Sequence, residues 1–149
     1  MPKFGPESLK ERATAHDLLQ KLADRVVQTY DCKFLKGHRG REEQHAAFLA
    51  GNSKLDWPNG NHNAYPSKAM DLAPFVTRPD FVGVPWPDKK LRKKTYDKDL
   101  ALFYHFAGYV VATAREMGIP IRWGGDWDSD RDLTDQNFDD LVHFELVGI

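Results

Sequence analysis

The sequence predicts one α+β domain in which a small, mostly antiparallel sheet is flanked by helices. Apolar residues recur at helical spacing in residues 14–29 and 100–117, and two such helices can pack on one sheet. Four short segments are strand candidates: 32–35, 69–75, 121–123 and 141–146. With 149 residues and 41% hydrophobic content, the chain can bury one core but not a second domain of ordinary size. We therefore expect residues 1–149 to form a single domain.

The first half of the chain contains two of the predicted helices. Leucine, alanine and valine between Leu18 and Val27 recur on one face of the 14–29 helix. A turn at residues 37–40 follows the first strand, and a helix over 41–50 is ended by Gly51. Residues 52–67 are rich in Asn, Ser, Pro and Gly, which predicts a long ordered loop. A loop of that length in a compact domain is usually functional or disordered.

The second half contains the strongest helix and three of the strands. The 69–75 strand is ended by proline, and residues 77–94, rich in proline and lysine, are expected to form an irregular surface excursion. Leu102, Phe103, Phe106 and Val110 share one face of the 100–117 helix, which Gly118 ends. No internal repeat or low-complexity segment is present.

Composition and charge exclude several classes of protein. The net charge of −1, from 21 basic and 22 acidic residues, gives no electrostatic basis for nucleic-acid binding. Cys32, the single cysteine, excludes an internal disulfide and a thiolate-rich structural zinc site. The charged start of the sequence has no apolar segment of secretory type, and no segment approaches the roughly 18 apolar residues of a membrane span. We expect a soluble protein made in the cytoplasm, with no membrane anchor.

Two short segments contain a set of residues suited to a catalytic zinc ion. Such a site uses three protein ligands, often histidine and carboxylate, and leaves one position for water. His62, Asp71 and His143 supply such a set. Taken singly, His62 could be a solvated loop residue and Asp71 a solvent-facing strand residue. Together they favour a zinc hydrolase.

Strand alternation gives His143 a direction. It places Leu141, His143 and Glu145 on one face, and the apolar residues between and after them on the core face. Asp140 lies three residues before His143 and could accept a proton from a zinc-bound water, although spacing alone does not choose between it and Asp139.

Arg39 lies in the predicted turn before the second helix. An arginine in a turn is usually a surface residue. Its functional interpretation is a fixed positive charge that stabilises an oxyanion or docks a substrate carboxylate.

Taken in order, these segments resemble a family of zinc peptidases. The family includes D-Ala-D-Ala carboxypeptidases and dipeptidases and the phage L-alanyl-D-glutamate endopeptidases. Its pattern SxHxxGxAxD, followed by an acidic residue three positions before a second His, is similar to His62, Ala69, Asp71, Asp140 and His143. Its G-x-R-(S/T)-x-x-x-Q segment resembles residues 37–44, and residues 122–127 (RWGGDW) resemble a run of the phage endopeptidase branch.

Two departures from the family pattern stand out. His62 and Asp71 are nine residues apart where the simpler pattern has seven, which resembles a branch variant HNxxPSxAxD with a longer loop. The acidic residue before the second His is Asp140 and not Glu, which is closer to the phage endopeptidases.

The resemblance implies a hedgehog/D-Ala-D-Ala-peptidase-like fold with the zinc site on the sheet. It implies that His62, Asp71 and His143 are zinc ligands, that Asp140 is the general base, and that Arg39 assists the transition state. The implied reaction is hydrolysis of the L-alanyl-D-glutamate bond of peptidoglycan stem peptides by a phage endolysin. The alternatives are a D,D-carboxypeptidase or dipeptidase and a zinc-containing cell-wall-binding module without turnover.

Further expectations concern partners and a second metal. A lysis enzyme made in the host cytoplasm would need a holin to reach the wall, and we expect a monomer without a separate wall-binding domain. Asp126, Asp128 and Asp130 resemble the opening of a calcium loop. The sixth position has no glycine and the twelfth no glutamate, so a solvated acidic loop is the simpler interpretation.

Overall fold

A four-stranded antiparallel sheet forms the centre of the computed structural model, which describes residues 2–135 and 139–149. The strand order is β1-β2-β6-β5, and every pairing in this sheet is antiparallel. Its strands are β1 (Cys32–Lys36), β2 (Ala69–Pro74), β5 (Ile121–Gly124) and β6 (Asp140–Leu146). The predicted α+β class is confirmed.

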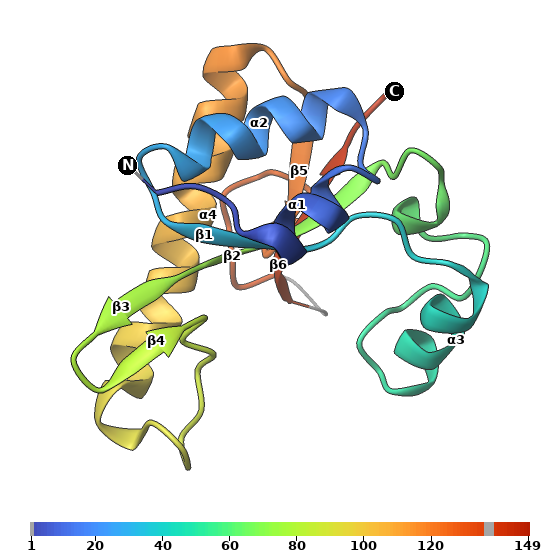
Figure 1. Cartoon of the computed structure of the whole chain (residues 1–149). Helices are drawn as coiled ribbons and strands as arrows, with labels where there is room; N and C mark the ends of the chain where they lie inside the picture. The colour runs from blue at the N-terminus through green and yellow to red at the C-terminus, as the bar shows by residue number, and fades with distance from the viewer. Residues whose placement is uncertain (1, 136–138) are drawn as a thin grey trace.

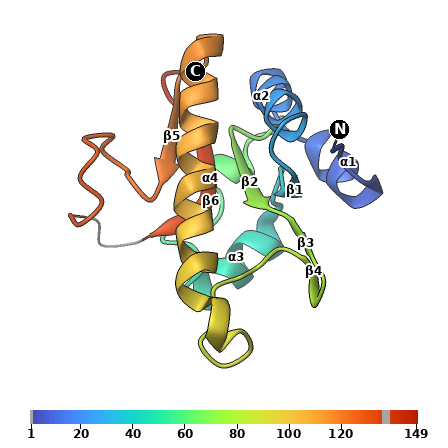
Figure 2. The same ribbon diagram turned by 90° about the vertical axis from the view of Figure 1, so that its left-hand side faces the viewer.

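Four α-helices accompany the sheet (Figure 1). They are α1 (Pro6–Arg12), α2 (Asp17–Val27), α3 (Arg41–Leu49) and α4 (Tyr96–Met117). Helices α2 and α4 pack against each other and against the sheet, and Figure 2 shows α4 running along the molecule in front of the strands. Two 3₁₀ turns, η1 (Asn61–Asn63) and η2 (Lys93–Thr95), complete the helical segments of the described residues.

The core lies between these two helices and one face of the sheet. Leu19, Leu22 and Val26 of α2 and Phe106 and Val110 of α4 are fully or almost fully buried. The strands contribute Phe34, Met70, Leu72 and Phe144 to the same cluster. Since neighbouring strand residues point to opposite faces, Asp71 lies on the other face of β2, as the sequence predicted.

The structure corrects two predictions about element boundaries. The expected 14–29 helix is shorter, and a separate α1 precedes it, begun by Pro6 in the position that proline favours. The expected irregular excursion contains a hairpin of β3 (Val76–Arg78) and β4 (Phe81–Gly83). Strands of three residues are too short for alternation to reveal them.

The predicted face pattern of the last strand holds only for its second half. Phe144 and Leu146 are in the core, but Val142 is not, and Leu141 packs against the core. A bulge causes this difference, because β6 has three residues between Asp140 and Phe144 where β5 passes directly from Gly124 to Trp123.

Gly124 permits this irregular pairing. A Cβ atom at Gly124 would lie 2.2 Å from the backbone oxygen of Asp140, so a side chain there would force β5 and β6 apart. Within the described residues, no helix is both long and apolar enough to span a membrane.

Candidate metal centre

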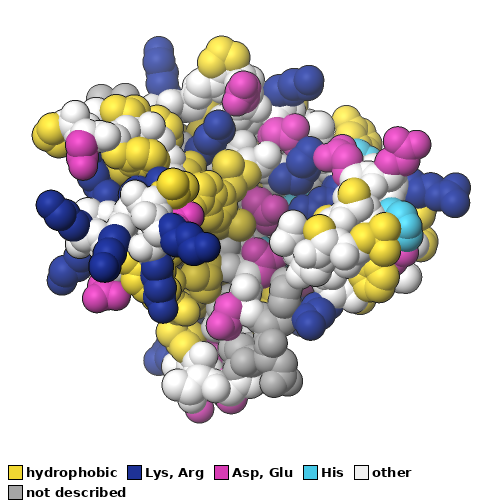
Figure 3. Space-filling model, turned by 90° about the horizontal axis from the view of Figure 1, so that it is seen from below, with side chains coloured by type: hydrophobic (Ala, Val, Ile, Leu, Met, Phe, Trp, Pro, Cys, Tyr) yellow, Lys and Arg dark blue, Asp and Glu magenta, His cyan; other side chains and the backbone are white. Residues whose placement is uncertain are grey.

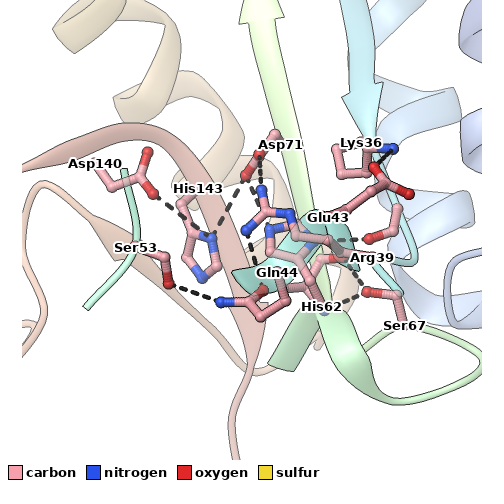
Figure 4. Close-up of polar contacts among 12 residues, drawn as sticks. Lys36, Arg39, Glu43, Gln44, Ser53, His62, Ser67, Asp71, Asp140 and His143 are labelled. Atoms are coloured by element: carbon pink, nitrogen blue, oxygen red, sulfur yellow. Dashed lines mark hydrogen bonds and ion pairs between the residues drawn. The ribbon is translucent and has the colours of Figure 1, made fainter. Parts of the chain in front are cut away.

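Three potential metal ligands converge on the face of the sheet opposite the core (Figure 4). Asp71 of β2 and His143 of β6 are direct cross-strand partners, and His62 comes from η1, in the long loop before β2. His62 Nε2 lies 3.1 Å and His143 Nδ1 lies 3.5 Å from Asp71 Oδ1. One donor atom from each residue lies within 4.8 Å of the other two. The structure thus brings together all three residues that the sequence predicted as ligands.

The imidazole nitrogen of each histidine that points away from Asp71 forms a hydrogen bond with another protein group. His62 Nδ1 lies 2.7 Å from the backbone oxygen of Gly37, and His143 Nε2 lies 2.6 Å from Glu145 Oε1. Histidines that bind metals usually donate their other N–H to a carbonyl or carboxylate in this way, which fixes the tautomer and the ring orientation. The donor set and its support therefore fit a divalent metal ion.

Glu145 was placed on the His143 face by alternation but was not predicted as a functional residue. Its side chain is 7% exposed, and Oε2 accepts hydrogen bonds from Asn61 Nδ2 at 2.8 Å and from Arg122 Nε at 2.8 Å. The signal that could have identified it is its spacing, since a residue two positions after a strand-borne ligand lies beside it. Glu145 connects both histidine-bearing segments, because Asn61 directly precedes His62.

Asp140 lies next to the three ligands. Its Oδ2 atom is 3.9 Å from His143 Nδ1, whereas Asp139 is exposed to solvent. Burial, together with the negative charge of Asp71, raises the pKa of Asp140 to about 6. Of the two rival carboxylates, the structure places Asp140 at the site.

Arg39 reaches the site from the turn before α3, where its backbone N–H donates to the oxygen of His62 at 2.8 Å. Its Nη2 atom lies 3.6 Å from Asp71 Oδ2 and its Nη1 donates to Gln44 Oε1 at 3.2 Å. Gln44 is buried and also donates to Ser53 Oγ at 2.9 Å. Gln44 was part of the segment that resembled the family motif, but no role was predicted for it.

The titratable side chains of this site strongly shift the pKa values of one another. Burial raises the pKa of Asp71, but the two histidines outweigh it and hold that pKa well below its usual range. Burial lowers the pKa of His143, but hydrogen bonds to Asp71 and Glu145 outweigh it and raise that pKa to about 10. Such clusters of shifted groups in a cleft are typical of functional sites.

Two of the candidate ligands, His62 and His143, line a cleft of about 500 Å³. One wall consists of the loop after α3, including Ser53 and Leu55, and the other includes Trp127, whose ring centroid lies 5.4 Å from that of His143. Arg39 and Asp140 also line this cleft. Charged groups, an aromatic wall and both candidate histidine ligands therefore face one space, and Asp71 lies against the two histidines.

The acidic loop after β5 forms a second cluster. Carboxylate oxygens of Asp126, Asp128 and Asp130 lie within 4.8 Å of one another. Asp126 Oδ2 accepts from the Arg131 N–H at 2.9 Å, while its buried Oδ1 has no hydrogen-bond partner in the described part of the chain. The loop therefore gathers the three predicted calcium ligands, and calcium binding itself stays a prediction.

Comparison with known proteins agrees with the geometry. The family model of the phage L-alanyl-D-glutamate peptidases matches residues 1–147. The chain belongs to this family. It is 28% identical to the L-alanyl-D-glutamate peptidase of Escherichia phage T5, over 97% of this chain and 98% of that protein. The predicted family is confirmed.

A solved structure shares the fold. The crystal structure of the Serratia marcescens L-Ala D-Glu endopeptidase ChiX superimposes with a TM-score of 0.65 over 98% of this chain and 91% of that one. Since the two sequences are only 20% identical, this likeness supports the fold and not the individual side chains.

Proposed function

We propose that this protein is a zinc-dependent endopeptidase that hydrolyses the bond between L-alanine and D-glutamate in peptidoglycan stem peptides. The observation that carries the proposal is the convergence of His62, Asp71 and His143, with Asp140 beside them and the two histidines lining the same cleft as Asp140. Membership of the L-alanyl-D-glutamate peptidase family, over residues 1–147, supports this choice of bond. It also supports assignment to the phage endolysins, the hydrolases that degrade the wall.

Zinc suits the donor set best. Two histidines and one carboxylate are a common ligand set of catalytic zinc sites, and the chain has no thiolate cluster to favour a structural site. When bound by His62, Asp71 and His143, zinc would polarise the scissile carbonyl and acidify a water molecule.

The remaining residues have separate roles in the proposed reaction. Asp140 accepts a proton from the attacking water and donates it to the leaving nitrogen, so that the C–N bond breaks into a carboxyl and an amine. Arg39 offers its guanidinium to the carbonyl oxygen as negative charge develops there. The bond to Gln44 and the proximity of Asp71 fix the guanidinium in place. Glu145 holds the His143 ring from behind and is a positioning residue.

Matched substitutions of two adjacent carboxylates test the assignment of the base. We expect Asp140→Asn to abolish hydrolysis of a soluble stem peptide while zinc content stays near one per chain. Asp139→Asn, the control, should keep nearly full activity because its side chain is exposed. Loss of zinc from the Asp140 variant would show that Asp140 is a metal ligand. Loss of activity only in the Asp139 variant would assign the role of base to Asp139.

The biological setting extends the same proposal. A phage endolysin produced in the host cytoplasm would act on the wall as a monomer after a holin opens the membrane. A calcium ion bound in the acidic loop by Asp126, Asp128 and Asp130 would regulate this lysin. If calcium binds there, removing it with a selective chelator at a constant zinc concentration should lower activity. Unchanged activity would indicate that the segment is a solvated acidic loop without a regulatory calcium ion.

A further inference from the structure

A concentrated group of lysines lies outside the catalytic cleft. The members of this group are exposed, and none forms an ion pair with another residue in the described ranges 2–135 and 139–149; they are Lys89, Lys90, Lys93, Lys94 and Lys98. Residues 77–99 contain seven basic and four acidic residues, whereas the rest of the chain contains fourteen basic and eighteen acidic residues. Positive charge is therefore concentrated in one segment of a chain whose net charge is close to zero.

The two arginines of this segment anchor it to the domain. Arg78 Nη2 lies 2.6 Å from one oxygen of Asp99, a fully buried residue of α4, and Arg92 Nε lies 3.8 Å from the other. The Arg92 guanidinium also donates to the backbone oxygen of Trp86 at 2.5 Å and lies 4.8 Å above the Phe81 ring. These contacts fix the β3–β4 hairpin and the loop after it to the start of α4. The lysines thus extend from an ordered base.

Large apolar side chains are exposed among these lysines. Val82, Trp86 and Leu91 have exposed fractions of 62%, 45% and 77%. Trp86 is supported from the core side by Phe103, at a ring-centroid distance of 5.3 Å, so its outer face is held towards solvent. We call this surface, made by the five lysines with Val82, Trp86 and Leu91, the lysine platform. Mixed cationic and apolar surfaces of this kind indicate an interaction site.

The platform and α3, whose following loop lines the catalytic cleft, flank the lower half of the molecule. In Figure 1 the β3–β4 hairpin and α3 lie on opposite sides of the lower half of the molecule. Seen from below, Lys and Arg side chains gather with apolar ones over the hairpin side, and acidic side chains lie in the hollow beside it (Figure 3). A polymer whose peptide enters the cleft could therefore continue across the platform.

We propose that the lysine platform binds peptidoglycan outside the peptide that is cleaved. This inference rests on the proposed function, because a wall peptide in the cleft places the rest of the same polymer nearby. Stem peptides carry free carboxylates at repeated intervals, which complement five exposed ammonium groups that form no ion pair within the described residues. Trp86 and Leu91 match the apolar C–H faces of sugar rings. Each exposed ion pair is weak, but many contacts along one polymer act at high effective concentration and retain the enzyme on its substrate.

A pair of charge-matched variants tests the platform. The platform variant changes Lys89, Lys90, Lys93 and Lys94 to Gln. The control variant changes four exposed basic residues of the N-terminal helical region and its leading segment to Gln: Lys3, Lys10, Lys21 and Arg25. Both are made in the Asp140→Asn background for binding to purified sacculi by co-sedimentation, and in the active background for hydrolysis of a soluble stem peptide. Unfolding temperatures verify that both variants are folded.

We expect the platform variant to bind sacculi roughly tenfold more weakly than the control variant, since several weak contacts are lost together. The difference should shrink at high salt, because exposed charges are screened. Hydrolysis of the soluble peptide should be equal in both. Equal binding of the two variants to sacculi overturns the proposal, as does a platform-dependent interaction found only with vesicles of anionic lipid. Failure of the unmodified protein to cleave the soluble peptide would instead refute the proposed function.

Discussion

Replacing Glu145 with Gln tests how the metal centre is built. The carboxylate accepts from His143 Nε2 through one oxygen and from Asn61 and Arg122 through the other. An amide has one accepting oxygen and one donating NH₂ group, so it cannot accept from both sides. Either the His143 ring loses its acceptor, or the Arg122 guanidinium faces another donor. Loss of such an outer partner typically weakens metal binding by about 10–100-fold, which corresponds to about 1.4–2.8 kcal/mol.

The assay is a zinc-affinity measurement by competition with a chromophoric chelator. Glu116→Gln provides the control, because it makes the same chemical change at an exposed position on α4. We expect the dissociation constant of zinc to rise 10–100-fold in the Glu145 variant and to stay unchanged in the control. A contrary result would be a Glu145 variant whose dissociation constant for zinc stays within twofold of that of the unmodified protein, while its thermal stability falls. That result would show that the carboxylate stabilises the fold and does not position His143.

Other consequences can be measured on the same purified protein. Arg39→Ala should lower kcat by roughly 100-fold, as removal of an oxyanion donor does, with zinc content retained; a change confined to KM would assign Arg39 to substrate docking. The midpoint of the acid limb of the profile of kcat/KM against pH should lie at or below pH 6, because Asp140 must be deprotonated to act as the base. The surrounding protein groups raise the pKa of Asp140 to about 6, and a neighbouring cation can only lower that pKa. A midpoint above pH 7 would exclude Asp140 as the group that titrates. Phe106→Ala should cost about 3–5 kcal/mol of unfolding free energy, since Phe106 is 1% exposed in the core, and urea denaturation showing a loss under 1 kcal/mol would contradict the packing.

The sequence was informative where periodicity and chemistry coincide. Met70 and Leu72 face the core and Asp71 the opposite side, as alternation requires, because both faces of β2 have distinct partners. The end of helix α4 at Met117 was predicted correctly, because Gly118 adopts a positive φ of 70° there, but the helix begins at Tyr96, before the predicted residue 100. The convergence of His62 with His143, however, depends on a loop path that periodicity cannot supply, and the resemblance to a family supplied it.

Features decided by tertiary contacts were missed. The bulge opposite Gly124 depends on the approach of two backbones, so the alternation of β6 predicted a core position for Val142 that it does not occupy. Gln44 and Glu145 are unremarkable in sequence, because their importance comes from what they touch. The β3–β4 hairpin was read as irregular, and its fixed position depends on the burial of Asp99, far along the chain.

The most direct test of the central claim is the identity of the bond that is cut. The zinc-loaded protein is incubated with a defined muropeptide, and the new termini are determined by mass spectrometry and amino-group labelling. The account predicts a new L-alanine carboxyl group and a new D-glutamate amino group, with both lost in the Asp140→Asn variant. Release of terminal D-alanine instead, or cleavage that persists without Asp140, would contradict it.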